Sequence, residues 1–249
     1  MCGGSRLAGN RASSIDAHTI LDSNFSVPTR STMPRFLLCA LMLSALGTPA
    51  RAFELSTSVL DRDGEPVSHV VVYAVPDGAA AATARPAPGV AAMGQRDSAF
   101  VPHILTVETG TLVEFPNTDK VSHHVYSFSP AKSFELPLYK GNVHEPLKFD
   151  RPGVVTLGCN IHDGMLGYIL VVETPYFALT DEHGRARLED LPSGNYTVQV
   201  WTPRMREERL PAAVDISATG ALVDIEFEFT SKLFPPHAHE GTSLSWEDY

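Results

Sequence analysis

The chain has 249 residues, of which 43% are hydrophobic, and its formal net charge is −10. This length suggests one large domain or two small ones, and the hydrophobic content is sufficient for a packed core. An acidic chain repels nucleic acid and anionic lipid and is steered toward cationic partners, so we expect no nucleic-acid partner.

The N-terminal part is predicted to be an export signal. Residues 1–32 carry no pattern and are expected to be a disordered upstream extension, with Met33 as the true start. After Met33 a short apolar run ends at Leu46, and Ala50 and Ala52 frame a small-residue cleavage site. This pattern predicts a signal peptide over 33–52, cleaved after Ala52, and a periplasmic location. The run is shorter than the roughly 20 apolar residues of a membrane span, so we expect no span after cleavage.

Cleavage would change both the charge and the cysteine count. Residues 1–52 contain five basic and two acidic residues, so the mature chain would carry 19 − 5 = 14 positive and 29 − 2 = 27 negative charges, a net of −13. Cys2 and Cys39 would be removed, which leaves Cys159. A lone cysteine in an exported protein is an intermolecular linker, a buried inert residue or a metal ligand.

The mature chain is predicted to be all-β, because short runs of Val, Leu, Phe and Tyr are separated by Gly, Pro, Asn and Asp. It begins with "FELSTSVLDRDGEPVSHVVVYAVPDG", residues 53–78, which predicts a strand, an Asp-Gly turn and a second strand. An Ala/Pro-rich linker is expected over 79–92.

The region 93–173 contains a set of soft metal ligands. Cys159, His162 and Met165 follow the spacing C-x2-H-x2-M between two predicted strands, and His123 lies 36 residues before the cysteine. Thiolate and imidazole bind copper strongly in a plane, and a thioether adds a weak axial bond. The adjacent His124 should face the opposite side of its strand and not bind the same ion. The residues therefore predict one type 1 copper ion held by His123, Cys159, His162 and Met165.

These residues stand in two segments, "FVPHILTVETGTLVEFPNTDKVSHHV" and "FDRPGVVTLGCNIHDGMLGYILVV". Together they resemble the cupredoxins, with amicyanin closest in loop length and plastocyanin a longer-looped relative. The resemblance implies a Greek-key β-sandwich with the copper site at one end, and it places Asn117, His124 and Asn160 around the ligands. Two positions depart from the family pattern: His124 stands where Asn is usual, and Ile161 stands where Pro is usual.

A second pattern flanks this region. The phrase "D-x-D-G-x-P-V" begins at Asp61, and "FALTDEHGRARLEDLPSGNYTVQVWTPR" supplies a "D-x-x-G" and an "L-P-x-G-x-Y" phrase. These resemble the two ends of a carboxypeptidase regulatory-like, prealbumin-type sandwich, also called a carbohydrate-binding-like fold, over residues 53–78 and 174–230. The cupredoxin region would then be inserted into this sandwich, the alternative being two sandwiches side by side. A polar tail is expected over 231–249, where His237 and His239 could hold a surface metal.

The combined layout resembles bacterial proteins labelled methylamine utilisation proteins, which implies redox service in the periplasm. We expect a monomeric one-electron carrier, not an enzyme, with a periplasmic c-type cytochrome or another redox protein as partner. Two alternatives stay open: a copper-binding or copper-delivery protein, and a cell-envelope module that binds glycan or protein around a structural copper site.

Overall fold

A computed structural model describes residues 53–78, 88–205, 212–215 and 222–234. The predicted extension 1–32, the signal peptide 33–52, most of the linker and the tail with His237 and His239 lie outside these residues. No helix within the described ranges is both long and apolar enough to cross a membrane. The predicted all-β class is confirmed, since the regular elements of the described chain are strands.

Seven strands from the two ends of the described chain form one group, which we call the flanking sandwich. They are β1 (Phe53–Leu60), β2 (Val71–Pro76), β13 (Phe177–Leu179), β14 (Arg185–Leu191), β15 (Asn195–Trp201), β16 (Ala212–Asp215) and β17 (Leu222–Glu228). Ten strands between them form the central sandwich. They are β3 (Val90–Ala92), β4 (Gly94–Arg96), β5 (Ala99–Val101), β6 (Ile104–Glu108), β7 (Thr111–Glu114), β8 (His123–Ser129), β9 (Lys132–Tyr139), β10 (Leu147–Phe149), β11 (Gly153–Cys159) and β12 (Leu166–Val172).

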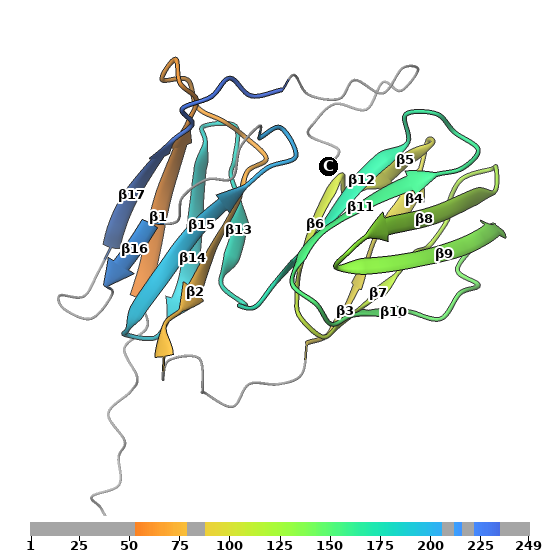
Figure 1. Ribbon diagram of the computed structural model, residues 1–249, viewed down its shortest axis with the longest axis horizontal. Helices are drawn as coiled ribbons and strands as arrows, with labels where there is room; N and C mark the ends of the chain where they lie inside the picture. Colours follow the sequence, from red (N-terminus) through yellow and green to blue (C-terminus); the bar gives the residue numbers. More distant parts are fainter. Residues whose placement is uncertain (1–52, 79–87, 206–211, 216–221, 235–249) are drawn as a thin grey trace, which may run out of the picture. The chain divides into compact units, whose positions relative to one another are not determined.

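The flanking sandwich joins segments that are far apart in the sequence. One sheet has the order β14-β1-β17, and the other has the order β13-β2-β15-β16. Figure 1 shows the orange β1 between blue strands of the C-terminal part, antiparallel to β14 and parallel to β17. Buried and partly exposed residues alternate along β1, so one face of this strand enters a core that both sheets share. Strands β1 and β2 therefore pair with strands from the C-terminal part of the chain.

Two Asp-x-x-Gly segments of the flanking sandwich, 61–64 and 181–184, form similar turns. The Asp61 carboxylate accepts the backbone N–H groups of Asp63 and Glu65, and Asp181 accepts those of His183 and Arg185, at 2.8–3.0 Å. An aspartate that bonds to the backbone ahead of it stabilises a turn locally. In each turn a glycine with positive φ follows: Gly64 at 83° and Gly184 at 69°.

We expect Gly184→Ala to destabilise the protein far more than Gly64→Ala. A Cβ atom at Gly184 would lie 2.5 Å from the Val59 carbonyl oxygen and 3.0 Å from the Val67 nitrogen, whereas nothing lies within 4 Å of one at Gly64. Both substitutions carry the left-handed backbone cost of roughly 1–2 kcal/mol. Only Gly184→Ala adds overpacking, so its total should reach about 2–5 kcal/mol. Urea unfolding of both variants measures this difference, and equal losses would show that the close backbone approach does not matter.

The central sandwich consists of a five-stranded sheet, β6-β12-β11-β8-β9, and a three-stranded sheet, β10-β7-β3, with the hairpin β4-β5 beside them. The core contains side chains from both sheets, including Val113 of β7, Phe149 of β10 and Leu157 of β11. It also contains Cys159 and Met165, so two of the predicted ligands belong to the packed interior.

Three details differ from the sequence predictions. Residues 90–92, assigned to the linker, form strand β3 parallel to β7, because an apolar Val-Ala-Ala run can complete the edge of a sheet. Leu233, assigned to the polar tail, is buried in the flanking core. His103 has no second ligand at metal-binding spacing in the sequence and is therefore predicted to be a surface residue, but it is 2% exposed and packs edge-on against the Tyr168 ring.

A small hydrophobic cluster contains residues of both sandwiches. Its buried members are Val71 of β2, Ile104 of β6, and Leu170 and Val172 of β12. All of these lie in the compact unit Pro49–Tyr249. The outer face of the five-stranded sheet is therefore apolar at β6 and β12. In an isolated central sandwich this apolar face would be exposed to water.

Candidate metal centre

The alternation of strand β8 separates the two adjacent histidines. Along His123–Ser129, His123, Val125 and Ser127 are buried, while the residues between them are only partly buried or exposed. His123 has 0% exposure. The His124 Nε2 atom instead lies 2.8 Å from the Glu135 carboxylate on β9. The predicted choice of His123, with His124 facing away, agrees with this geometry.

Strand β11 brings the cysteine to the histidine. It is antiparallel to β8, with Cys159 opposite Val125, so the end of β11 lies beside the start of β8. Cys159 is buried on the same face of the strand as Leu157, two residues earlier. The next residue, Asn160, donates its backbone N–H to the His124 carbonyl at 3.0 Å. This bond attaches the β11–β12 loop to β8 and explains how residues 36 positions apart meet.

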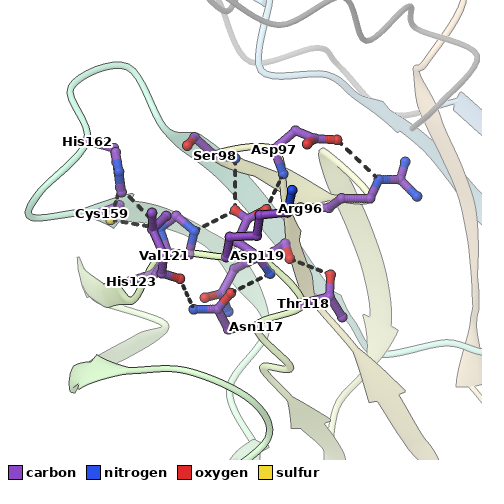
Figure 2. A network of polar contacts seen from close by, with 12 residues as sticks. Arg96, Asp97, Ser98, Asn117, Thr118, Asp119, Val121, His123, Cys159 and His162 are labelled. Carbon is purple, nitrogen blue, oxygen red and sulfur yellow. Dashed lines mark hydrogen bonds and ion pairs between the residues drawn. The ribbon is translucent and has the colours of Figure 1, made fainter.

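Three ligand atoms converge at this end of the central sandwich (Figure 2). The distance from His123 Nδ1 to His162 Nδ1 is 3.1 Å, and Cys159 Sγ lies 3.7 and 3.5 Å from these two nitrogens. Metal–nitrogen and metal–sulfur bonds of about 2.0–2.3 Å can reach one ion from such a triangle. One thiolate and two imidazoles are also the donors that suit copper, so the residues fit this metal.

Met165 occupies the place expected of a fourth ligand in the chain. It is 4% exposed, lies in the same core cluster as Cys159, and its backbone N–H donates to the His162 carbonyl at 3.3 Å. That bond turns the loop from His162 back to the start of β12, and Gly164 within it has a φ of +80°. The axial bond from the Met165 sulfur stays a prediction.

Asp119 is a site residue that the sequence analysis missed. Its Oδ2 atom lies 2.6 Å from His123 Nε2, at the edge of the ring opposite to the one facing Cys159 and His162 (Figure 2). Burial alone would raise the pKa of Asp119. Hydrogen bonds from the Ser98 backbone, the His123 side chain and the Asp97 backbone outweigh it, so the pKa lies below its usual value. A carboxylate four residues before a ligand histidine, within a turn, is the signal that could have identified it.

Asn117 holds the segment that leads to His123. Its Nδ2 group donates to the Val121 and Tyr139 carbonyls at 3.0 and 2.9 Å, and its Oδ1 atom accepts the Asp119 N–H at 2.9 Å. The side chain of Asn117 and the backbone N–H of Asn160 thus hold the segments that carry the ligands, while His124 contributes its carbonyl oxygen.

Tyr139 closes the buried side of the centre. It pairs with His123 across β8 and β9, and its hydroxyl donates to the Phe115 carbonyl at 2.7 Å. Burial is the main factor that raises the pKa of Tyr139 to about 12, against a hydrogen bond from Gln95. The phenol therefore stays protonated and neutral beside the cluster at physiological pH.

The opposite side of the centre approaches solvent. His162 is partly exposed, and its neighbour Ile161 is 50% exposed. Val121, two residues before His123, is 48% exposed. Exposed apolar side chains thus lie one residue before the partly exposed His162 and two residues before the buried His123.

No family model matches the chain, and no curated protein matches it. Among solved structures, a purple cupredoxin from Nitrosopumilus maritimus is similar at 22% identity and a TM-score of 0.29, over 32% of this chain and 96% of that one. A reduced Cu(I) amicyanin with a proline replaced by glycine is similar at 21% identity and a TM-score of 0.31. An oxidised amicyanin with a methionine replaced by leucine is similar at 20% identity and a TM-score of 0.31. Both amicyanin matches cover 40% of this chain and 99% of the other.

Proposed function

We propose that this protein is an exported type 1 copper protein that carries single electrons in a periplasmic redox chain. The observation that carries this proposal is the triangle of His123 Nδ1, Cys159 Sγ and His162 Nδ1, with sides of 3.1–3.7 Å. Copper bound there would alternate between Cu(II) and Cu(I) without converting a substrate.

The residues around the triangle suit this task because they resist rearrangement. His123 and Cys159 belong to two hydrogen-bonded strands, and both are buried. Donors that keep their positions in both oxidation states lower the structural change that accompanies electron transfer. The same burial argues against easy surrender of the ion, so it favours a carrier over a copper-delivery protein. The second candidate function is a cell-envelope module that binds glycan or protein, because the flanking sandwich has no part in the proposed electron transfer.

Electrons would enter and leave at His162, the ligand that is partly exposed and that follows the exposed apolar Ile161. Partners of redox proteins form small, short-lived contacts of less than about 1,200 Å². Ile161 and Val121 supply such a contact, and the net charge of −13 after signal cleavage would speed encounter with a locally basic periplasmic cytochrome.

We expect Ile161→Asp to slow electron transfer to a periplasmic c-type cytochrome without loss of copper, because a charge at the contact must be desolvated. Phe128→Asp is the matched control. Phe128 is 80% exposed but stands five residues from His123 along β8, roughly 17 Å away. Stopped-flow rates at rising salt measure the effect, and the wild-type rate should fall as charges are screened. Equal rates in both variants would refute this contact, and copper that reduces no cytochrome but passes to an apo-acceptor would favour delivery.

A further inference from the structure

The carboxylate of Asp119 lies at the back of the ligand His123 in a largely enclosed position. Its side chain is 9% exposed and that of His123 is 0% exposed. The two ring nitrogens of His123 therefore have different neighbours: Nδ1 faces Cys159 and His162, and Nε2 faces Asp119. A neutral imidazole carries one N–H, and the hydrogen bond it makes decides which nitrogen carries it.

The same carboxylate is held by the turn between β4 and β5. Its Oδ1 atom accepts the Asp97 N–H at 2.6 Å and its Oδ2 atom accepts the Ser98 N–H at 2.9 Å. Asp97 and Ser98 have φ of 53° and 59°, which directs consecutive amide groups toward Asp119 (Figure 2). Two of its three partners are backbone N–H groups, which hold the carboxylate as an anionic acceptor. An anionic acceptor favours a proton on the third partner, His123 Nε2.

We propose that Asp119 is a positioning residue for the copper centre, which fixes the His123 tautomer and biases the centre toward Cu(II). This inference rests on the proposed function. The Nε2–H···Asp119 bond leaves the Nδ1 lone pair free for the ion, and a carboxylate partner raises the basicity of a ligand imidazole. A fixed negative charge behind the ligand stabilises Cu(II), which carries more charge, over Cu(I). The competing explanation is that Asp119 only anchors the β4–β5 turn.

The tautomer can be measured on the metal-free wild-type protein at neutral pH. With 15N-labelled histidine, NMR should show His123 as a single Nε2–H tautomer whose proton is protected from exchange with water. A proton on Nδ1, or rapid exchange at Nε2, would overturn the inference. The measurement needs neither copper nor a variant, so it remains decisive if an Asp119 variant fails to fold or if the copper spectrum contradicts the proposed function.

The charge effect is tested by Asp119→Asn, with Asp97→Asn as the matched control in the same turn. The Asp97 side chain is 65% exposed and lies 3.9 Å from the Arg96 guanidinium, and the only contact of Asp97 with Asp119 is through its backbone N–H. Asparagine also tolerates a positive φ. Asp119→Asn should lower the ratio of Cu(II) to Cu(I) affinity at least tenfold, which raises the reduction potential of a one-electron couple by at least 59 mV. Asp97→Asn should change the ratio less than about twofold, because the screened charge is exposed.

Protein-film voltammetry of the three copper-loaded proteins gives these potentials, and thermal unfolding gives their stabilities. A potential shift confined to Asp119→Asn supports the inference. Equal potentials in all three proteins, with a lower unfolding temperature for Asp119→Asn alone, would show that Asp119 is only a turn anchor. Equal shifts in both variants would likewise overturn the inference.

Discussion

Addition of Cu(II) to the wild-type protein is expected to give an intense visible absorption band, and Cys159→Ser is expected to abolish it. The band would arise from charge transfer between the Cys159 thiolate and copper. A serine hydroxyl supplies no thiolate, so the variant should bind Cu(II) weakly and show only a pale spectrum. Absorption and electron paramagnetic resonance spectra during titration with Cu(II) measure both properties.

The same variant should keep its fold. Cys159 is 8% exposed, and one small polar replacement in a core costs about 1–3 kcal/mol. Circular dichroism and urea unfolding check this. Met165→Leu is the matched control: it also removes a buried sulfur but leaves the thiolate, so an intense band should persist with a changed position. A pale tetragonal spectrum in the wild-type protein would refute the type 1 assignment, and global unfolding of Cys159→Ser would make that cysteine structural.

A fragment of residues 88–173 is expected to fold and bind copper by itself, whereas residues 53–173 should gain no further ordered structure. Every sheet partner of β3–β12 lies within 88–173, while the partners of β1 and β2 are β13–β15 and β17. A two-stranded piece without its partners is marginally stable in water. NMR spectra of both fragments test this, since the 53–173 spectrum should show the 88–173 signals plus those of an unfolded segment.

The isolated fragment should be less stable than the whole protein. Ile104, Leu170 and Val172 are buried in the cluster that includes Val71, and cutting the chain exposes them. Each such side chain is worth roughly 1.5–3 kcal/mol when fully buried, and partial exposure should cost part of this. If 88–173 is unfolded at equilibrium, the two sandwiches depend on one another for folding, and the predicted insertion of one independent domain into another is wrong.

Local sequence patterns were sufficient to identify the candidate copper ligands. A strand exposes alternate residues to opposite faces, so the neighbours of His123 and His124 in "HHVYSF" indicate which one enters the core. Likewise, Cys159 and His162 lie within one short loop, where the chain itself limits their separation. The turns at Asp61 and Asp181 could also be predicted from the sequence, because hydrogen bonds within four residues close them.

The sequence by itself thus determined the strand-rich class of the described chain and the residues that can meet at one loop, since both follow from short-range periodicity and local turn chemistry. Only the tertiary structure decided what surrounds them. Asp119 became a partner of His123 because a turn more than 20 residues earlier directs the Asp97 and Ser98 amide groups at its carboxylate. His103 became buried because Tyr168, 65 residues later, packs against it. Contacts across such separations depend on which strands pair, and no local pattern carries that information.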